Sequence, residues 1–348
     1  MTPPAQPGRL PTVRTVASLA GVSRQTVSNV LNFPERVGPK LQERVHAAIE
    51  ELGYRPSAIA RSLALQSTGL IAYRVGKSRG YEDQSLDPFM RELSRIGKDH
   101  HYRLVLQYAA EDDSSQITEY EDLYARRAMD AVVITESHPL DARVDWLKAH
   151  EVPFVAYGRP WGDPQPSHSW VDLDVEAGQR AATEHLIANG HRRIAYLGLP
   201  LDGARASAHR DGWAQAMGRL VPEQPLAGLE YLGSAEETSG LVARALEDAG
   251  ATGFVCNHDG YADAALHALW AAGRTPGRDV AVVGFGNSRR ARRAYPPLSS
   301  ITQSVEHIAE LVWSSLLDQL GGTGAPPLQE LLAPDLAIRE SSDFVLPS

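Results

Sequence analysis

The stretch VRTVASLAGVSRQTVSNVL, residues 13–31, constrains the fold more than any other part of the sequence. Its apolar residues recur with helical spacing in two short segments, which predicts two helices joined by a tight turn. Gly21 ends the first helix, because glycine adopts a left-handed backbone at little cost. Ser23 is placed to cap the second. This is the helix-turn-helix pattern, with residues 23–31 as the recognition helix.

The outer face of the recognition helix carries hydrogen-bonding side chains. Arg24 can bind guanine with two hydrogen bonds, and Gln25 and Asn29 can pair with adenine. Thr26 belongs to the same candidate set for reading bases. The alternative is an ordinary helical hairpin whose polar face is simply solvated.

The charge distribution favours a DNA contact at one end of the chain. The chain has a net charge of −9, yet residues 1–65 contain eight Lys and Arg against four Glu. The rest of the chain is therefore strongly acidic. A basic head on an acidic body suits a protein that touches a polyanion at one end only.

The next segments complete a small head. Residues 1–11 are rich in proline and are expected to be disordered. Pro39 suits the first turn of a third helix, which runs to about Leu52 and closes a head spanning residues 12–54. Residues 55–68 contain a short hinge helix and linker. A helix this short is marginal alone, so it would fold only when docked.

From residue 69 the sequence alternates between strands and helices. This rhythm predicts α/β architecture with doubly wound parallel sheets covered by helices. The pattern is too long for one sheet, so we expect two lobes, with the chain crossing between them near residues 161–175. The expected strands are 70–75, 103–108, 131–135, 154–157, 193–198, 253–256 and 280–285, with a weaker one at 229–232. The expected helices are 89–98, 117–127, 175–189, 204–219, 238–249 and 261–272.

Composition excludes several classes of site. The single cysteine, Cys256, rules out an internal disulfide framework and a thiolate zinc site. The histidines have no metal-ligand spacing, and no dinucleotide or phosphate-loop motif is present. We expect no metal and no cofactor. The sequence shows no leader and no apolar segment of membrane-spanning length, so we expect a cytoplasmic protein.

Four motifs in this order resemble the lactose-repressor (LacI) family of bacterial transcription regulators. They are TVASLAGVSRQTVSNVLN, RVHAAIEELGYRPSAIARSLA, HLIANGHRRIAYLG and DVAVVGFGN…YPPLSSITQ. The resemblance covers residues 12–342. It implies a DNA-binding head, a hinge helix and a two-lobed core resembling periplasmic binding proteins. It also implies a homodimer on a pseudo-palindromic operator, controlled by a small molecule between the lobes.

The resemblance assigns DNA contacts residue by residue. Arg24, Gln25 and Asn29 match positions that read bases, and Thr26 is predicted to act beside them. Leu63 matches the leucine that wedges into the minor groove, where apolar side chains kink DNA. Hinge positions Ala60 and Arg61 belong with Leu63. The predicted contacts to the DNA backbone are Thr15, Ser23, Ser28 and Tyr54.

The resemblance also assigns an effector site to loops at strand ends. Charged groups with aromatic walls suit a polar ligand such as a sugar. Two positions depart from the family, because His209 stands where an arginine is usual and Gly286 where an aspartate is usual. The expected effector contacts are Phe89, Arg159, Asp174, His209, Arg210, Asp259 and Asn287.

The sequence therefore predicts a DNA-binding repressor whose operator affinity is controlled by a bound metabolite. A metabolite sensor without regulated DNA binding and an enzyme on a Rossmann-like core are the alternatives. No nucleophile lies in a recognisable setting, so no enzyme activity is expected. No leucine heptads follow Ser342, so we expect a dimer and no tetramer. The basic run at residues 289–293 is expected to be a solvated or interface loop. The core is expected at 69–342, with a first lobe of 69–165 and 298–325 and a second lobe of 166–297 and 326–342.

Overall fold

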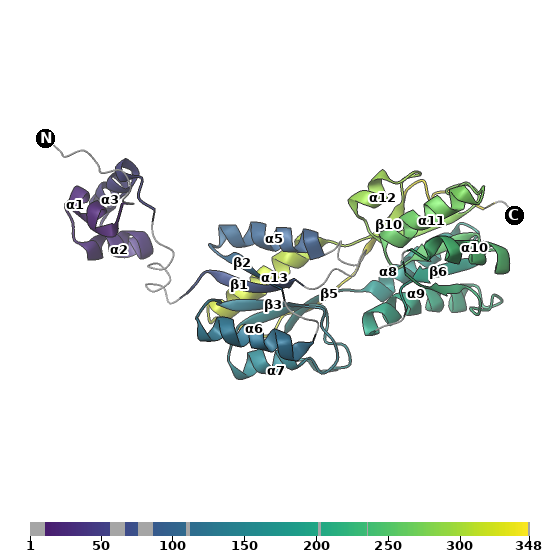
Figure 1. Ribbon diagram of the computed structural model, residues 1–348, viewed down its shortest axis with the longest axis horizontal. Coiled ribbons are helices and arrows are strands. Elements are labelled where there is room, and N and C mark those ends of the chain that lie inside the picture. Colours follow the sequence, from purple (N-terminus) through teal and green to yellow (C-terminus); the bar gives the residue numbers. More distant parts are fainter. Residues whose placement is uncertain are drawn as a thin grey trace. The chain divides into compact units, whose positions relative to one another are not determined.

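The structure is a computed structural model that describes residues 11–55, 67–75, 86–108, 112–200, 203–234 and 236–346. The chain divides into two compact units. One unit contains Met1–Leu70 with Asp122–Asp130, and the other contains Ile71–Glu121 with Ala131–Ser348. Each is described separately below (Figure 1).

The N-terminal unit begins with the predicted helical head. Its helices are α1 (Val13–Ala20), α2 (Arg24–Asn32), the 3₁₀ turn η1 (Pro34–Arg36) and α3 (Pro39–Leu52). Gly21 ends α1 with φ of 62°, and the Ser23 side chain accepts a hydrogen bond from the backbone N–H of Thr26. Both predictions for the turn between the two helices are therefore confirmed.

The head has its own apolar core. Val16, Val27 and Val45, one from each helix, are fully buried and pack together. Arg44 of α3 donates hydrogen bonds to the backbone carbonyls of Ala20 and Gly21, at 2.6 and 3.2 Å. This guanidinium satisfies carbonyl groups that the end of α1 leaves without helical partners. The three helices are thus joined by apolar packing and by one charged contact at the turn.

The larger unit begins with a six-stranded sheet in the order β11-β5-β4-β3-β1-β2. Its pairings β1–β3, β3–β4, β4–β5 and β5–β11 are parallel. Helices α5 and α13 lie on one face, and α6 and α7 on the other (Figure 1). The strands are β1 (Leu70–Val75), β2 (Arg103–Tyr108), β3 (Ala131–Thr135), β4 (Phe154–Tyr157), β5 (Ser169–Leu173) and β11 (Gln329–Leu332). The helices are α5 (Leu86–Asp99), α6 (Asp113–Ala125), α7 (Ala142–Ala149) and α13 (Val305–Leu320).

A second six-stranded sheet has the order β12-β10-β9-β8-β6-β7. Its pairings β9–β10, β6–β7, β6–β8 and β8–β9 are parallel, whereas β10–β12 is antiparallel. Its strands are β6 (Ile194–Gly198), β7 (Glu230–Leu232), β8 (Gly253–Cys256), β9 (Ala281–Gly286), β10 (Ser299–Thr302) and β12 (Asp335–Ala337). Its helices are α8 (Val175–Ala188), α9 (Ala204–Leu220), α10 (Thr238–Asp248), α11 (Asp259–Ala271) and α12 (Arg289–Arg293).

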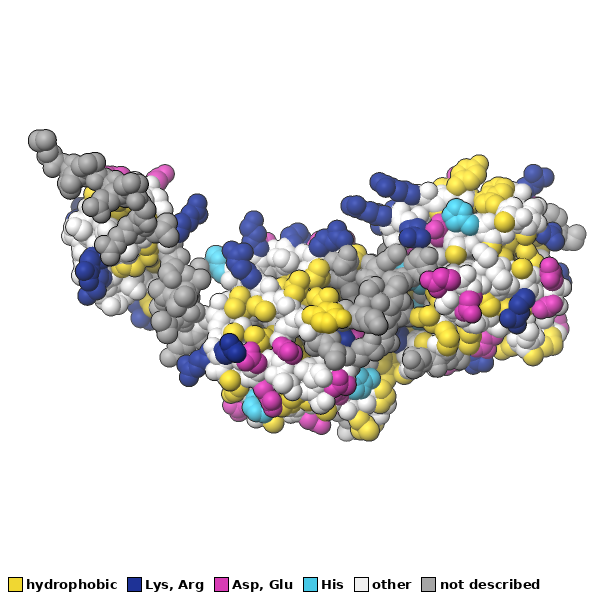
Figure 2. All heavy atoms as spheres, in the orientation of Figure 1, with side chains coloured by type: hydrophobic (Ala, Val, Ile, Leu, Met, Phe, Trp, Pro, Cys, Tyr) yellow, Lys and Arg dark blue, Asp and Glu magenta, His cyan; other side chains and the backbone are white. Residues whose placement is uncertain are grey.

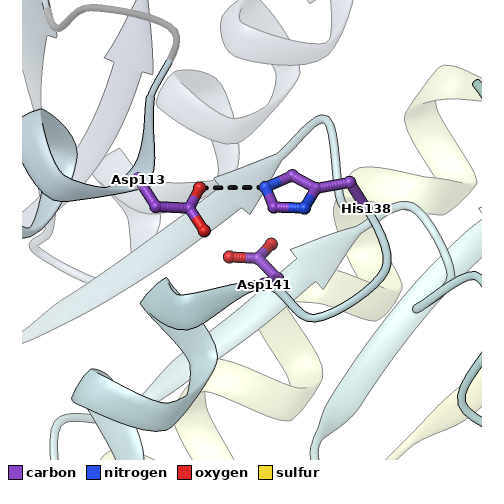
Figure 3. A group of neighbouring side chains, drawn as sticks. All are labelled: Asp113, His138 and Asp141. Atoms are coloured by element: carbon purple, nitrogen blue, oxygen red, sulfur yellow. Dashed lines mark hydrogen bonds and ion pairs between the residues drawn. The ribbon is translucent and has the colours of Figure 1, made fainter.

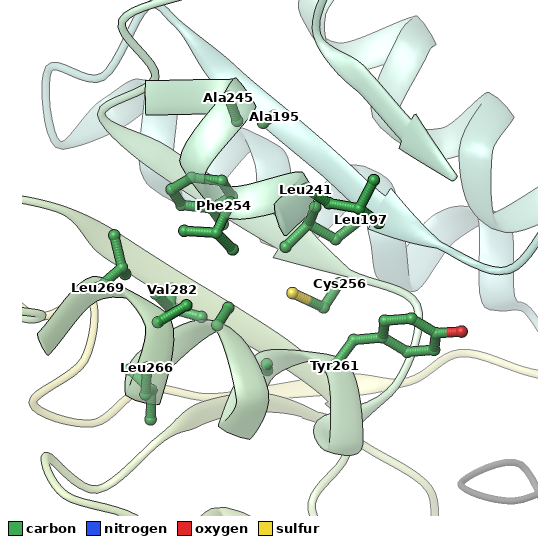
Figure 4. Packing of buried hydrophobic residues seen from close by; sticks show 14 of the residues in the cluster. Ala195, Leu197, Leu241, Ala245, Phe254, Cys256, Tyr261, Leu266, Leu269 and Val282 are labelled. Carbon is green, nitrogen blue, oxygen red and sulfur yellow. The ribbon is translucent and has the colours of Figure 1, made fainter. Parts of the chain in front are cut away.

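Alternation along the strands of the second sheet builds two apolar layers. Ala195 and Leu197 of β6 face the cluster formed with α10 and α11, whereas Ile194 and Tyr196 face the cluster formed with α8 and α9. Successive strand residues point to opposite faces, so a strand covered on both sides is apolar throughout. Figure 4 shows the first of these layers, with Cys256 buried among leucines. The predicted α/β fold class is confirmed.

The expected lobe boundaries need correction. Ser169–Leu173 was expected in the crossover and the second lobe, yet it forms β5 inside the first sheet. Ser299–Thr302 was expected in the first lobe, yet β10 belongs to the second sheet. Gln329–Leu332, expected in the second lobe, forms β11 of the first. These three strands lie in segments near the points where the chain crosses between the two sheets. They are short and contain polar residues, so in the sequence they resemble loops. The arginine run at residues 289–293 is also a helix, α12, and not a loop.

Within the described ranges, no helix combines the length and the apolar character needed to cross a membrane.

Candidate functional site

The outer face of α2 presents the predicted base-reading side chains. Arg24 and Gln25 are exposed and Asn29 is half-exposed. The Gln25 side-chain amide donates to the side-chain oxygen of Asn29 at 3.0 Å, because residues four apart lie on one helix face. This pair holds two amides side by side, where each keeps donors and acceptors for base edges. Figure 2 shows Lys and Arg side chains on the visible surface of the head.

The predicted backbone contacts have different local roles. Thr12 and Thr15 form a reciprocal capping box at the start of α1, and Ser23 caps α2. Ser28 accepts a hydrogen bond from Asn32 at 3.4 Å. Tyr54 is only 7% exposed and packs in the core of the head. The structure therefore gives Tyr54 a packing role. The sequence did not reveal this role, because it shows only an aromatic residue that follows the end of a helix.

The predicted hinge residues Ala60, Arg61 and Leu63 lie outside the described residues.

A buried carboxylate forms the centre of a second candidate site. Asp172 of β5 is fully buried. The Arg159 Nε atom lies 3.3 Å from Asp172 Oδ2, and Arg205 Nη1 donates to Asp172 Oδ1 at 2.8 Å. Arg159 follows β4 of the first sheet, whereas Arg205 begins α9 after β6 of the second. Residues at the carboxyl ends of parallel strands thus meet at this carboxylate, where ligands bind in such folds.

An aromatic ring extends this group. The Arg159 guanidinium lies over the Trp161 ring, 3.9 Å from its centroid. Arg159 Nη2 and the side-chain nitrogen of Gln179 are buried without a hydrogen-bond partner among the described residues. The side-chain oxygen of Asn257, which follows β8, is in the same state. Buried polar atoms are normally paired, so the Arg159 nitrogen is an atom of this group that a polar ligand can satisfy. We call Arg159, Trp161, Asp172 and Arg205 the Asp172 group.

The sequence predicted a ligand contact at Asp174, and the structure shows a helix cap there. The Asp174 carboxylate caps α8 by accepting from the backbone N–H of Ala177 at 3.0 Å. Asp172 was missed because its segment was interpreted as a crossover loop. The segment SWVDL gives no alternating signal, because the polar residues Ser169 and Asp172 interrupt the apolar residues of β5.

His209 and Arg210 are adjacent in α9, but their side chains lie in different surroundings. His209 is buried, edge-on to Phe285 with ring centroids 4.6 Å apart. Burial lowers the pKa of His209 well below its usual value, so the imidazole is neutral at pH 7. Arg210 instead bonds Asp211 at 3.1 Å and Glu230 at 3.3 Å. The prediction that Arg210 belongs to the effector site is not supported, because adjacent helix residues point in different directions.

Asp259, a predicted ligand contact, is held by hydrogen bonds within the chain. It is fully buried and accepts hydrogen bonds from the Ser300 hydroxyl at 2.5 Å and the backbone N–H of Ser288 at 2.7 Å. Burial raises the pKa of this carboxyl. Gly286 lies next to this carboxylate. Its φ is 120°, and a Cβ built there would lie 3.5 Å from Asp259 Oδ2. An aspartate at 286 would bring a second negative charge towards this buried acid.

The remaining predicted contacts are engaged within the chain. The Asn287 side chain accepts from Arg339 at 2.6 Å and donates to Thr302 at 3.2 Å. Phe89 is fully buried in the first lobe, with its ring centroid 4.4 Å from that of Tyr157. Both were predicted from sequence as ligand contacts, and the structure shows ring packing for Phe89 and hydrogen bonds within the chain for Asn287.

A cluster of two acids and a histidine also lies in the first lobe (Figure 3). Asp113, His138 and Asp141 hold ligand-type atoms within 4.8 Å of one another. His138 lies 2.9 Å from Asp113, and Arg143 donates two hydrogen bonds to Asp141 at 2.7 and 2.6 Å. The chain therefore supplies its own cation here, and the cluster joins the starts of α6 and α7.

Two family models match the chain. "Bacterial regulatory proteins, lacI family" matches residues 12–57, and "Periplasmic binding protein-like domain" matches residues 183–342. The chain is 34% identical to the HTH-type transcriptional regulator CelR of Thermobifida fusca, over 96% of this chain and 98% of the relative. It is 30% identical to the HTH-type transcriptional repressor PurR of Mannheimia succiniciproducens, over 95% and 98%.

Solved structures agree with these relatives. A complex of the transcriptional regulator CelR with cellobiose has a TM-score of 0.69 and 29% identity, covering 95% of this chain and 99% of that one. The lac repressor dimer bound to operator and the anti-inducer ONPF has a TM-score of 0.79 and 25% identity, covering 96% and 99%. The relatives are transcription regulators and not enzymes, and the chain matches them over head and core alike. The chain therefore belongs to the lacI family of bacterial regulatory proteins.

Proposed function

We propose that this DNA-binding transcription regulator represses from a two-fold symmetric operator as a cytoplasmic homodimer. Arg24, Gln25 and Asn29 of α2 would read the bases, with Thr26 beside them. Thr15, Ser23 and Ser28 would contact the DNA backbone, and the hinge residues Ala60, Arg61 and Leu63 the minor groove. The exposed Gln25–Asn29 pair supports this proposal, because it presents oriented amides on the exposed face of α2.

We further propose that the controlling ligand is a sugar bound at the Asp172 group. The observation that carries this proposal is the fully buried Asp172 carboxylate between Arg159 and Arg205. Carboxylates accept hydrogen bonds from sugar hydroxyls, guanidinium groups donate to hydroxyl oxygens, and the Trp161 ring offers an apolar face to a sugar ring. The similarity to the cellobiose complex of CelR supports a β-linked disaccharide as the first candidate.

The origin of these residues explains how such a ligand would control DNA affinity. Asp172 and Arg159 belong to the first sheet, whereas Arg205 begins a helix that covers the second. A ligand that bonds to all three stabilises one relative arrangement of the two sheets over another. Ligands shift an equilibrium only by such differences in affinity between states. The sign of the effect, release or tightening of DNA, follows from which arrangement the ligand prefers.

The test begins with selection of an operator from a genomic DNA library by the purified full chain. The winning duplex is then titrated with and without cellobiose, maltose and glucose. We expect a palindromic duplex whose affinity changes at least tenfold with one sugar. A duplex bound equally with and without every sugar would contradict the sugar proposal and leave the DNA function standing. The absence of any selected duplex would contradict the operator proposal and favour a sensor.

Variants locate the ligand. Asp172→Asn removes the negative charge and should weaken sugar binding at least tenfold in calorimetry, while operator affinity without sugar stays within twofold. Asp163→Asn is the matched control, because Asp163 is an exposed acid in the loop before β5. Equal sugar affinity in both variants would place the ligand elsewhere.

A further inference from the structure

One carboxylate holds the segment that leads into β1. The Asp130 side chain accepts four hydrogen bonds from the three residues directly before this strand. Its Oδ1 atom accepts from the backbone N–H of Thr68 at 2.7 Å and from the Thr68 hydroxyl at 2.9 Å. Its Oδ2 atom accepts from the backbone N–H of Gly69 and from the Ser67 hydroxyl, both at 2.7 Å. Each oxygen thus accepts one backbone N–H and one hydroxyl, which fills the four acceptor positions of a carboxylate.

The same segment is held by its backbone as well. The backbone N–H of Asp130 donates to the Leu70 carbonyl at 2.8 Å, and the backbone N–H of Leu70 donates to the Thr68 hydroxyl oxygen at 3.1 Å. Gly69 has φ of 70°, a conformation that glycine adopts at little cost. Hydrogen bonds to an ionised acceptor are about twice as strong as neutral ones. We call Ser67, Thr68, Gly69 and Asp130 the Asp130 clamp.

The Asp130 clamp lies where the chain leaves the predicted hinge. The sequence assigns residues 55–68 to the hinge helix and linker, so the last two residues of that segment belong to the clamp. Asp130 directly precedes β3, and β1 and β3 pair in parallel with Ile71 opposite Ala131. The clamp therefore ties the end of the hinge segment to the chain just before a second strand of the first sheet.

A charged contact joins the other ends of the same two strands. Arg74 of β1 is 4% exposed, and its Nη1 atom donates to the carboxylate of Glu136, which follows β3, at 2.5 Å. Because β1, β3, β4 and β5 are parallel, these ends lie at the same edge of the sheet as Asp172 of β5. Rigid elements joined by hydrogen bonds and ion pairs carry coupling between sites. The β1–β3 pair thus connects the hinge end of the sheet to the end that holds the Asp172 group.

We propose that Asp130 is a positioning residue for regulated DNA binding, because its carboxylate fixes the point at which the hinge segment joins the core. This inference rests on the proposed function, since it needs an operator. A segment that is held in advance loses less conformational freedom when the hinge residues bind DNA. A released segment loses that freedom on binding, which weakens the complex. Its position also no longer follows the two strands that lead to the Asp172 group.

The test compares Asp130→Asn with the wild type and with Asp122→Asn on the selected operator. The amide keeps the shape of the carboxylate but has one acceptor oxygen, so either orientation turns its NH₂ group towards a backbone N–H of the clamp. Asp122 is a matched control, because it is an exposed acid of α6 that pairs with Arg126 at 2.7 Å. In anisotropy titrations we expect Asp130→Asn to weaken operator binding at least tenfold and Asp122→Asn to stay within twofold.

A second DNA separates positioning from loss of the fold. Affinity of Asp130→Asn for a duplex of unrelated sequence should stay within twofold, since non-specific binding comes from phosphate contacts. Operator affinity equal to that of Asp122→Asn would overturn the proposal, and so would an equal loss on both duplexes. If Asp130→Asn does not fold, Ser67→Ala combined with Thr68→Val removes both hydroxyl donors and leaves the carboxylate in place. This double variant should weaken operator binding at least threefold, and unchanged binding would overturn the proposal.

The link to the ligand has its own measurement. The probe is whichever of cellobiose, maltose and glucose changes the operator affinity of the wild type. In Asp130→Asn that change should shrink at least threefold, while the affinity for the sugar without DNA stays within twofold in calorimetry. An undiminished response would overturn the link. A wild type that selects no duplex would instead contradict the proposed function, and this inference with it.

Discussion

Gly212 of α9 lies directly against the backbone of Glu176 in α8. A Cβ built at 212 would lie 2.2 Å from the Glu176 carbonyl oxygen and 3.0 Å from the backbone nitrogen of Arg180. Backbone atoms cannot move aside as the end of a flexible side chain can. The missing side chain is therefore what lets these two helices pack so closely.

The first prediction follows from this contact. Gly212→Ala should lower the free energy of unfolding by about 3 kcal/mol, the upper part of the range for overpacking, because the two helices must separate. Gly218→Ala is the control in the same helix, since a Cβ there meets nothing within 4 Å. It should raise stability by about 0.5–1 kcal/mol. Urea denaturation measures both, and equal stabilities of the two variants would contradict the close packing.

The second prediction concerns Asp259. Asp259→Ala leaves the Ser300 hydroxyl and the Ser288 N–H without their acceptor, and each buried unsatisfied group costs about 1–3 kcal/mol. Asp263→Ala, on the same helix, removes a partly exposed ion pair with Arg290 and should cost at most about 1 kcal/mol. Thermal unfolding compares the two. A similar melting temperature in both variants would contradict the structural role of Asp259.

The third prediction is a loss of stability in mild acid. Burial lowers the pKa of His191 and of His258 to about 4, and that of His209 in the same direction. Below about pH 6.5 these imidazoles bind protons in the unfolded chain but stay neutral in the folded chain. The stability present at pH 7 is therefore lost as the pH falls. Each imidazole contributes about 1.4 kcal/mol per pH unit.

Urea denaturation at pH 7.5 and pH 5 measures this dependence. His191→Gln should make the curve between pH 5 and 6.5 shallower by the contribution of one imidazole. A wild-type stability that does not fall with pH, or a variant with unchanged slope, would contradict the assignment.

The fourth prediction concerns base reading by the Gln25–Asn29 pair. Gln25→Ala should relax base preference at one position of each operator half-site, at about 1–3 kcal/mol of discrimination. Because Gln25 holds the Asn29 amide at 3.0 Å, the double variant should lose less than the sum of the single losses. Anisotropy titrations on a set of single-base operator variants measure the loss. An even loss over all operators would indicate a phosphate contact instead.

The head and most of the sheet strands were predictable because their signals are local. Gly21, Ser23 and Pro39 mark helix ends by their own backbone preferences, and β-branched runs such as AVVIT at 131–135 mark buried strands. β5 was missed because Ser169 and Asp172 interrupt its apolar pattern. Those two polar residues are buried by partners far along the chain, Leu328 and Arg205, which no local window contains.

The effector assignments show the same limit. Arg159 was found from its position after a strand, and it does lie in the Asp172 group. Asp174 was preferred to Asp172 although the two lie in one short segment, because sequence alone does not tell which carboxylate caps a helix. Asp259 and Asn287 looked like ligand contacts since their partners, Ser300 and Arg339, are supplied by β10 and by the segment after β12.

The placement of β11 and β12 has a consequence for the order in which the protein is made. These strands lie at the edges of the first and the second sheet, and each is made after every other described strand of its sheet. Leu173 of β5 pairs with Leu332 of β11, which is made more than 150 residues later. Neither sheet is complete before β11 and β12 have been made, whereas the last helix of the head ends at Leu52. A chain that stops short of residue 329 would therefore carry an intact DNA-binding head on two sheets with open edges.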